Sequence, residues 1–367
     1  MQTLIFWQNI VSPHQLPYIK AIPRVNPAFN VILVVEQGMT DSRKAMGWVT
    51  EDIVETSRFN VIAAPSEEAM HALFVSYPEA QHFFSGIRSN SLVYIAFKVS
   101  MIYDVKRHLI VEGPFLYKYP LIIHYIKTLF TDYKYYKYIS KVYAIGNHAL
   151  NWYPKFGFKA HQIIPFSYCV ENIKTYVAIE NKDEVKFLFV GGLSHRKGVD
   201  LLLKACSEMR VGYHLDIIGD GAEREVLEAY CKSHDLNQVR FLGTKNNNEI
   251  RSMLHEYDVH ILPSRHDGWG AVINEALMAG LFVLCSTNCG AQELIQDKFN
   301  GIVFSHKKKK DLYNALLYCA THVAIIRAKK ESILQWSRCI EGDVIADYFV
   351  SALESDTRIT PPWHNFK

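Results

Sequence analysis

The chain has 367 residues, of which 49% are hydrophobic and 21% charged, with a formal net charge of +3. This length suits two domains, and the composition is that of a soluble globular protein. A net charge this small gives no case for a nucleic-acid partner. No run of about 18 apolar residues occurs, so we expect no transmembrane helix.

The first half of the chain opens on an apolar run that we expect to be a buried strand. Residues 1–15 carry neither a basic region nor a small-residue cleavage site, so we expect no signal peptide. Seven cysteines without a C-x-x-C pair predict buried free thiols and a cytoplasmic location. Further apolar runs predict a Rossmann-like domain over residues 1–167, with strands at 4–7, 29–35, 92–95, 109–111 and 142–145.

The second half has a more regular pattern. Short apolar strands alternate with helices, and glycines follow most of the strands, which predicts parallel βαβ units in a doubly wound sheet over residues 168–337. Ligands of such sheets bind beyond the carboxyl ends of the strands. The expected strands are 185–190, 214–218, 238–242, 259–262 and 282–285, and the expected helices are 199–209, 223–234, 249–256 and 270–279.

Residues 263–275 carry the strongest chemical signal. A strand is expected to end at Leu262, a polar loop containing Asp267 follows, and Gly268-Trp269-Gly270 opens a helix. A helix N-terminus offers unpaired amides and a partial positive charge to a diphosphate. A carboxylate in the second turn, here Glu275, could reach sugar hydroxyls. The pattern therefore favours a nucleotide-sugar clamp, and the alternative is that Asp267 caps the helix while Glu275 is merely solvated.

A basic pair, Arg196-Lys197, follows the strand at 185–190 and Gly191-Gly192. Such a pair before a helix is often only solvated charge. After a strand of a doubly wound sheet, a phosphate-binding role is the better interpretation.

Several motifs together resemble the retaining glycosyltransferases of family 4. Asp267-Gly-Trp-Gly-x4-Glu275 is similar to the E-x7-E signature of that family, usually written E-G-F-G-x4-E. Phe189-Val-Gly-Gly-Leu-Ser-His-Arg-Lys-Gly198 resembles the motif F-V-G-R-L-x-x-x-K-G. Other matches, in the family's order and spacing, lie at 215–221, 239–243, 258–264, 276–280 and 289–294.

This resemblance implies a GT-B fold, in which two Rossmann-like doubly wound domains face a central cleft. Residues 1–167 would form the acceptor-side domain and residues 168–337 the donor domain. Residues 338–367 would form a C-terminal helix that returns to the first domain.

The resemblance also implies roles for single residues. Lys197 would hold the donor diphosphate, Glu275 the nucleotide ribose and Asp267 the donor sugar. Further donor contacts are expected from the Arg196 cation and from loop residues, namely Gly268, Trp269, Gly270, Ala271, Gly290, Ala291 and Gln292.

Three departures from the family pattern stand out. The family arginine of G-R-L is Gly192 here, so one phosphate-binding cation is missing, and Arg196 could substitute for it. The first glutamate of E-x7-E is Asp267, one methylene shorter. The glycine-rich loop after the first strand is replaced by residues 10–18.

The activity that the resemblance implies is transfer of a hexose from a UDP- or GDP-sugar to a hydroxyl, with retention of anomeric configuration. It requires no protein nucleophile, no metal and no cofactor. Surface polysaccharide or glycolipid would be the product. The alternatives are a catalytically weak nucleotide-sugar-binding protein, kept open by Gly192 and Asp267, or another GT-B enzyme such as an epimerase or phosphorylase.

Two residues of the first half are candidates for orienting or deprotonating the acceptor. His14 lies in a loop after the first strand, and Glu112 follows the strand at 109–111. The alternative for each is a hydrogen bond that only stabilises its loop.

Residues 117–138 form a basic, aromatic and apolar stretch. Tyrosines beside lysines suit a lipid headgroup region, so this stretch could contact the inner face of the cytoplasmic membrane, as suits a lipid-linked acceptor. The alternative is a core-packing helix with a basic outer face.

Overall fold

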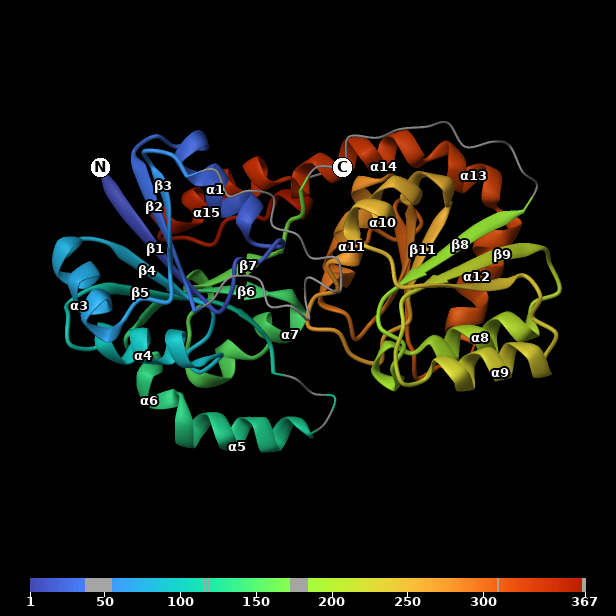
Figure 1. Cartoon of the computed structure of the whole chain (residues 1–367), viewed down its shortest axis with the longest axis horizontal. Helices are drawn as coiled ribbons and strands as arrows, with labels where there is room; N and C mark the ends of the chain where they lie inside the picture. The colour runs from blue at the N-terminus through green and yellow to red at the C-terminus, as the bar shows by residue number, and fades with distance from the viewer. Residues whose placement is uncertain (37–54, 115–116, 118, 172–183, 309, 365–367) are drawn as a thin grey trace. The chain divides into compact units, whose positions relative to one another are not determined.

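The computed structural model describes residues 1–36, 55–114, 117, 119–171, 184–308 and 310–364. The chain divides into two compact units (Figure 1). The first unit contains the described residues up to Glu171 and those from Cys339 onward, and the second contains the described residues between them.

The first unit is built on a seven-stranded parallel sheet in the order β3-β2-β1-β4-β5-β6-β7. Its central strands are apolar runs, and almost every residue of β1 and β2 is buried, as expected for a sheet covered on both faces. The strands are β1 (Gln2–Gln8), β2 (Phe29–Val35), β3 (Phe59–Ala63), β4 (Gln81–Phe84), β5 (Lys106–Glu112), β6 (Ile139–Ile145) and β7 (Ile163–Phe166).

The predicted strand at 92–95 was wrong, because these residues lie in helix α4 (Ser91–Ser100). The side chain of Asn90 accepts a hydrogen bond from the Val93 amide and so caps the helix. Leu92, Val93, Ala96 and Phe97 are buried at helical spacing. The other helices of the first unit are α1 (Leu16–Val25), α3 (Glu67–Ser76), α5 (Leu121–Thr131), α6 (Tyr133–Tyr136), α7 (Gly146–Leu150) and α15 (Gly342–Glu354).

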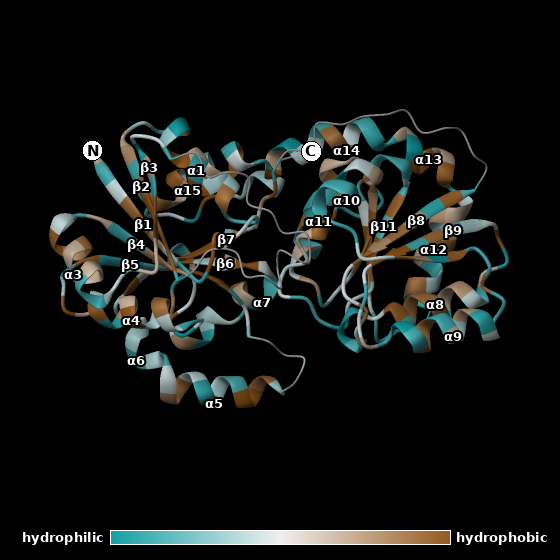
Figure 2. Cartoon of the chain, in the orientation of Figure 1, coloured by the Kyte–Doolittle hydropathy of each residue, from teal (hydrophilic) through white to brown (hydrophobic). Residues whose placement is uncertain are grey.

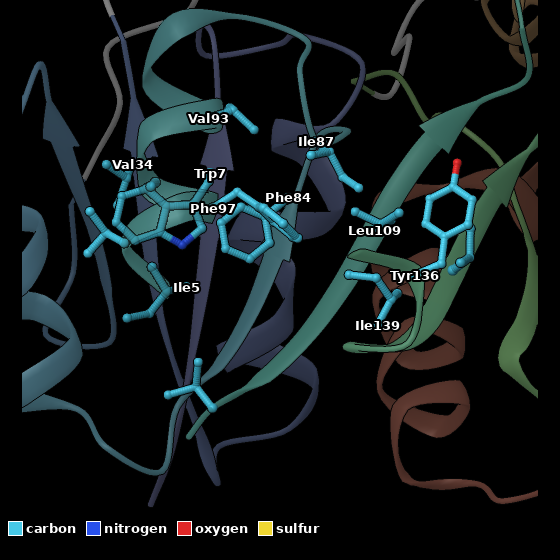
Figure 3. Close-up of a cluster of buried hydrophobic side chains, with 14 of the residues drawn as sticks. Ile5, Trp7, Val34, Phe84, Ile87, Val93, Phe97, Leu109, Tyr136 and Ile139 are labelled. Carbon is cyan, nitrogen blue, oxygen red and sulfur yellow. The ribbon is translucent and has the colours of Figure 1, made fainter. Parts of the chain in front are cut away.

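The core of the first unit joins strands that are distant in sequence (Figure 3). Trp7 of β1 stacks on Phe84 of β4, and Phe84 meets Phe97 of α4 edge to face. The C-terminal helix α15 closes another part of this core, because Phe349 stacks on Tyr143 of β6 with ring centroids 4.5 Å apart. Helix α15 is therefore an integral part of the first unit.

The second unit contains a six-stranded parallel sheet in the order β10-β9-β8-β11-β12-β13. Successive strands step outward from β8 to β10 on one side, and the chain then returns to place β11 against the other side of β8. The order therefore reverses between β8 and β11. The strands are β8 (Val185–Val190), β9 (Tyr213–Ile218), β10 (Val239–Gly243), β11 (Val259–Leu262), β12 (Phe282–Ser286) and β13 (Gly301–Phe304).

The four helices expected between residues 199 and 279 are present, with shifts of at most three residues at their ends. The expected helix at 270–279 is shorter, since α11 begins two residues later and ends one residue earlier. The helices are α8 (Val199–Glu208), α9 (Arg224–Ser233), α10 (Asn247–Met253), α11 (Val272–Met278), α12 (Asp311–Thr321), α13 (Val323–Ala328) and α14 (Lys330–Ser337).

The predicted fold class, two Rossmann-like parallel α/β domains, is thus confirmed. All seven cysteines are buried free thiols, as predicted. Within the residues that the structure describes, no helix has both the length and the apolar character needed to cross a membrane.

Candidate functional site

The predicted site residues of the second unit lie on two loops that leave neighbouring strands. Arg196 and Lys197 follow β8, and Asp267 follows β11. These two strands are paired at the point where the strand order reverses. In open α/β sheets the loops diverge at such a point and leave a crevice in which ligands bind.

An ion cluster joins the two loops. The Lys197 ammonium donates a hydrogen bond of 2.6 Å to the Asp267 carboxylate, and a guanidinium nitrogen of Arg196 lies 3.8 Å from the same oxygen. The Asp267 side chain is only 13% exposed. It makes no cap hydrogen bond to α11, so the alternative that Asp267 caps the helix is wrong. Two cations facing one carboxylate leave an excess of positive charge, as an anion-binding site requires.

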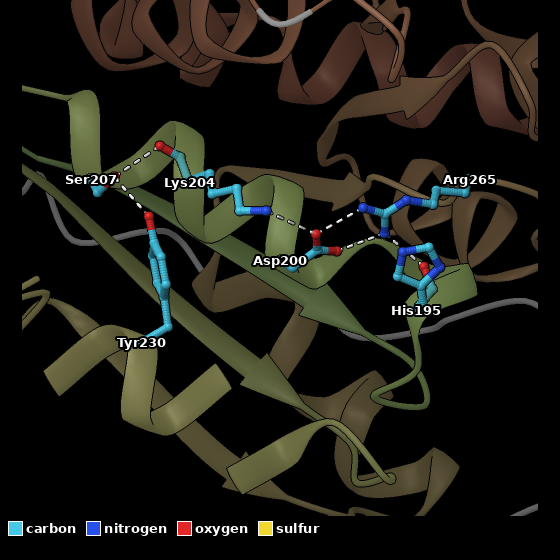
Figure 4. Close-up of polar contacts among 6 residues, drawn as sticks. All are labelled: His195, Asp200, Lys204, Ser207, Tyr230 and Arg265. Carbon is cyan, nitrogen blue, oxygen red and sulfur yellow. Dashed lines mark hydrogen bonds and ion pairs between the residues drawn. The ribbon is translucent and has the colours of Figure 1, made fainter. Parts of the chain in front are cut away.

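A second ion pair fixes the position of this cluster (Figure 4). The Arg265 guanidinium donates to both carboxylate oxygens of Asp200, at 2.6 and 2.7 Å, and to the His195 carbonyl at 2.7 Å. A bidentate pair of this kind sets the orientation of both partners. The loop after β11 is thereby fixed to the first turn of α8, directly beside Lys197. The sequence analysis did not identify this pair, because its members are 65 residues apart.

Gly198 allows the close approach of the two loops. Its φ is +73°, in the left-handed region that other residues rarely adopt. A Cβ atom at this position would lie 2.2 Å from the Pro263 carbonyl oxygen. Only glycine therefore fits between Lys197 and α8 while Pro263 occupies its present place.

Glu275 is buried rather than solvated, so the second part of that alternative is also wrong. The residue is 9% exposed, and its carboxylate lies 4.0 Å from a guanidinium nitrogen of Arg251 on α10. Burial raises the pKa of Glu275, and the charge of Arg251 opposes that rise. Nothing in the sequence indicated Arg251 as a neighbour, since it precedes Glu275 by 24 positions on a separate helix.

In the segment between Asp267 and α11, the backbone rather than the side chains is available to a ligand. Trp269 is only 2% exposed and its indole donates to Asn274 at 2.8 Å, so its side chain has a packing role. Gly270 has φ +91°, and a Cβ there would lie 2.6 Å from the Cys289 sulfur. The Gly270 and Ala271 amides donate to no backbone carbonyl within the described ranges, so they can bind an anion, and Gly268 precedes them in the same loop.

The amides at 290–292 do not have the role predicted for them. The amide of Gly290 donates to the Asp267 carbonyl, that of Ala291 to the Trp269 carbonyl and that of Gln292 to the Cys289 carbonyl. These bonds use the amides that were expected to contact the donor. The segment instead holds the Asp267 loop in place through these hydrogen bonds.

The two acceptor-side candidates of the first unit meet around one tyrosine. The rings of His14 and Tyr168 lie 6.2 Å apart, and the His14 carbonyl accepts from the Cys169 amide at 3.1 Å. Burial raises the pKa of Tyr168, and the charge of Glu112, to which its hydroxyl is hydrogen-bonded, raises it further. His14 follows β1 and Glu112 ends β5, so both lie at the carboxyl edge of the first sheet. Tyr168, which the sequence analysis did not single out, links them.

Comparison with known proteins finds glycosyltransferases that resemble the second half of the chain. Residues 173–320 match the family model described as Glycosyl transferases group 1. An uncharacterized glycosyltransferase of Methanocaldococcus jannaschii is 25% identical over 169 residues, which are 44% of this chain and 48% of that protein. The 2-deoxystreptamine N-acetyl-D-glucosaminyltransferase of Niallia circulans is 30% identical over 111 residues, 29% of this chain and 28% of the relative. The matches therefore span less than half the length of these relatives.

Solved structures resemble the whole chain. The lipopolysaccharide outer core galactosyltransferase WaaB, in its apo form, superposes with a TM-score of 0.70 at 15% identity, covering 96% of this chain and 99% of that one. Anabaena HepE in complex with UDP-glucose superposes with a TM-score of 0.68 at 14% identity, with the same coverage. At this identity the likeness concerns the fold, which is that of the GT-B glycosyltransferases. The family match thus covers residues 173–320, and the likeness to the solved structures concerns the GT-B fold of the described residues.

Proposed function

We propose that this protein transfers a hexose from a nucleotide-diphosphate sugar to a hydroxyl acceptor, with retention of anomeric configuration. The observation that carries the proposal is the ion cluster of Arg196, Lys197 and Asp267, which lies where the order of the second sheet reverses. This is where a parallel sheet binds nucleotides, and the cluster has more positive than negative charge.

Each charged group of this site has a suitable partner in a nucleotide sugar. The Lys197 ammonium and the Arg196 guanidinium bind the diphosphate, assisted by the Gly270 and Ala271 amides. The buried Glu275 carboxylate accepts hydrogen bonds from the ribose hydroxyls. Asp267 exchanges its bond with Lys197 for hydroxyls of the donor sugar. HepE, solved with UDP-glucose, supports a UDP-sugar as the first donor to test, with GDP-sugars next.

The chemistry follows from these charges. As the glycosidic bond breaks, negative charge develops on the departing diphosphate, and fixed cations stabilise this charge more than they stabilise the ground state. The acceptor attacks on the face that the diphosphate leaves, so neither a protein nucleophile nor a metal is required. In the first unit, His14, assisted by Tyr168 and Glu112, orients the acceptor hydroxyl. We further propose a cytoplasmic enzyme that acts at the membrane on surface polysaccharide or glycolipid.

A panel of UDP-, GDP- and ADP-sugars tests the proposal. We expect one donor to bind and to be hydrolysed slowly without acceptor, and we expect the released sugar to keep its anomeric configuration when followed by NMR. If no nucleotide sugar binds, the proposal is wrong. If an inverted product is found, the stereochemical part is wrong.

A second candidate function is binding of a nucleotide sugar without turnover. The 2.6 Å hydrogen bond between Lys197 and Asp267 favours this alternative, because the Asp267 carboxylate is already paired with the cation that would bind the diphosphate. Tight donor binding without transfer to any acceptor, together with no gain from Asp267→Glu, would support this alternative.

Restoring the cation that the family pattern places at position 192 is expected to strengthen donor binding. Gly192 is exposed, its φ lies outside the left-handed region, and a Cβ there would meet only the Asp220 carbonyl oxygen, at 3.8 Å. The site can therefore accept an arginine. We expect Gly192→Arg to lower the Kd for the nucleoside diphosphate roughly tenfold in calorimetry, as one charge-assisted hydrogen bond would.

The control for this prediction is Gly192→Gln, which adds length without charge and should leave the Kd nearly unchanged. An equal gain in both variants would show that charge is not the cause. An unchanged Kd in Gly192→Arg would place the diphosphate away from this loop.

A further inference from the structure

Helix α5 of the first unit is amphipathic, but its apolar face points away from the protein. Ile122, Ile126, Leu129 and Phe130 follow the i, i+4, i+7, i+8 spacing of one helix face, and they are 59%, 48%, 39% and 83% exposed. No residue of α5 is buried. For α5 the alternative of a core-packing helix with a basic outer face is therefore wrong, whereas Tyr136 of α6, in the same stretch, is buried in the core. We call these four residues the α5 apolar face.

The opposite side of α5 holds the helix to the unit. The Tyr125 ring stacks on Phe156 with centroids 5.0 Å apart. Arg88 donates to the Asp132 carboxylate at 2.7 Å and to the Thr131 carbonyl at 2.9 Å, directly at the end of the helix. These anchors keep the apolar face turned outward. Figures 1 and 2 show α5 at the margin of its unit, with apolar residues along the helix.

An outward apolar face of this size indicates a partner, because the hydrophobic effect strongly disfavours contiguous exposed apolar side chains. The surrounding charge identifies the partner. Residues 113–159 contain seven lysines and one acidic residue, Asp132, which is paired with Arg88. Lys127 of α5 and, shortly after the helix, Lys134 and Lys137 are exposed. A partner must therefore be both apolar and anionic.

We propose that the α5 apolar face inserts into the interface of an anionic lipid bilayer. An amphipathic helix with lysines at its flanks lies in the plane of such an interface with its apolar side in the acyl region. Exposed Tyr119, Tyr133 and Tyr138 add amphipathic rings that suit the headgroup layer. A second copy of the chain fits less well, because a symmetric contact would bring two lysine-rich surfaces together.

Vesicle co-sedimentation without any nucleotide sugar tests this proposal independently of the proposed activity. We expect binding to vesicles that contain phosphatidylglycerol, weak binding to phosphatidylcholine alone, and weaker binding at high salt. The variant Ile122→Ser/Ile126→Ser/Phe130→Ser should lose about 90% or more of the bound fraction, because it removes most of the apolar area that would insert into the bilayer. These side chains are exposed, so the fold should be retained, and a thermal melt checks this.

A matched control removes apolar side chains elsewhere. Ile102 and Val226 are both 71% exposed, and Ile102→Ser/Val226→Ser should bind vesicles like the wild type. For charge, Lys134→Glu/Lys137→Glu should weaken binding about tenfold or more, since each lysine near an anionic surface contributes several-fold. Lys307→Glu/Lys308→Glu changes two exposed lysines of the second unit by the same charge and should have little effect.

The proposal is overturned if the wild type does not bind anionic vesicles, or if the triple serine variant binds as well as the wild type. Equal losses in the two lysine pairs would indicate attraction by overall charge and would also overturn it. If the wild type fails to bind vesicles and yet has a higher mass than the triple serine variant in analytical ultracentrifugation, the α5 apolar face contacts a second copy of the chain instead.

Discussion

Replacing Lys197 by alanine is expected to lower kcat/KM for the nucleotide sugar about a thousandfold. The Lys197 side chain is 15% exposed and lies in the loop after the carboxyl end of β8, where the diphosphate would bind. A fixed cation in a partly dry site stabilises the charge that develops on the leaving group, and removal of one such group typically costs about a hundredfold to a thousandfold. Steady-state kinetics over a range of donor concentrations measures the effect.

The pattern of the loss distinguishes catalysis from simple binding. We expect kcat to fall more than KM rises, because the charge is largest in the transition state. Lys197→Arg should recover part of the activity. Lys204→Ala is the matched control, since Lys204 lies on α8 nearby, is 59% exposed and makes only a 3.5 Å contact with Asp200. If Lys197→Ala has near-normal kinetics, the diphosphate does not bind at this loop.

Replacing Glu275 by glutamine is expected to weaken donor binding roughly 10- to 100-fold, the effect of losing charged hydrogen bonds to the ribose. The substitution keeps the size of the side chain. Because burial raises the pKa of Glu275, donor affinity of the wild type should decline as the pH falls through that raised value. The glutamine variant should lack this decline. Calorimetric titration with the nucleoside diphosphate at several pH values tests both expectations.

Although Glu275→Gln should weaken donor binding, it should make the folded protein more stable. A carboxyl whose pKa is higher in the folded state binds more protons there, so its contribution to stability is lost as pH rises from the ordinary value of 4.5 through the raised one. At neutral pH, Glu275→Gln should therefore be more stable than the wild type. The difference should shrink near pH 4, as thermal unfolding would show.

This combination separates a binding defect from a folding defect. A variant that binds the donor poorly and unfolds at a higher temperature has lost a ligand contact rather than its structure. Glu228→Gln is the control, because Glu228 is 44% exposed and pairs with Arg224 rather than with Arg251. If Glu275→Gln binds the donor as the wild type does, Glu275 has a structural role only.

The sequence determined the elements between residues 185 and 286 because each one carries its own local signal. The strands β8 and β11 are short apolar runs followed by glycine or proline, and α8 and α9 follow helical spacing between them. In the first unit, residues 92–95 form an apolar run too short to separate a strand from a buried helix by periodicity. The Asn90 cap and the burial of Phe97 decided in favour of the helix.

The sequence also identified Lys197 and Asp267 as charged groups at strand-end loops, and Glu275 in the helix after the second of these loops, because these positions follow from the parallel sheet. Only the tertiary structure decided their partners. The pairs of Asp267 with Lys197, Asp200 with Arg265 and Glu275 with Arg251 join segments far apart in the chain, and no local pattern records such pairing.

The orientation of α5 shows the same limit. The apolar residues of α5 can be recognised in the sequence, but the same amphipathic pattern occurs whether the apolar face packs against a core or points outward. The anchors at Tyr125 and Asp132 turn it outward, and they depend on Phe156 and Arg88, which other segments supply. Local patterns thus determined which elements form, whereas contacts between distant segments decided which face of each element is left for a ligand or a membrane.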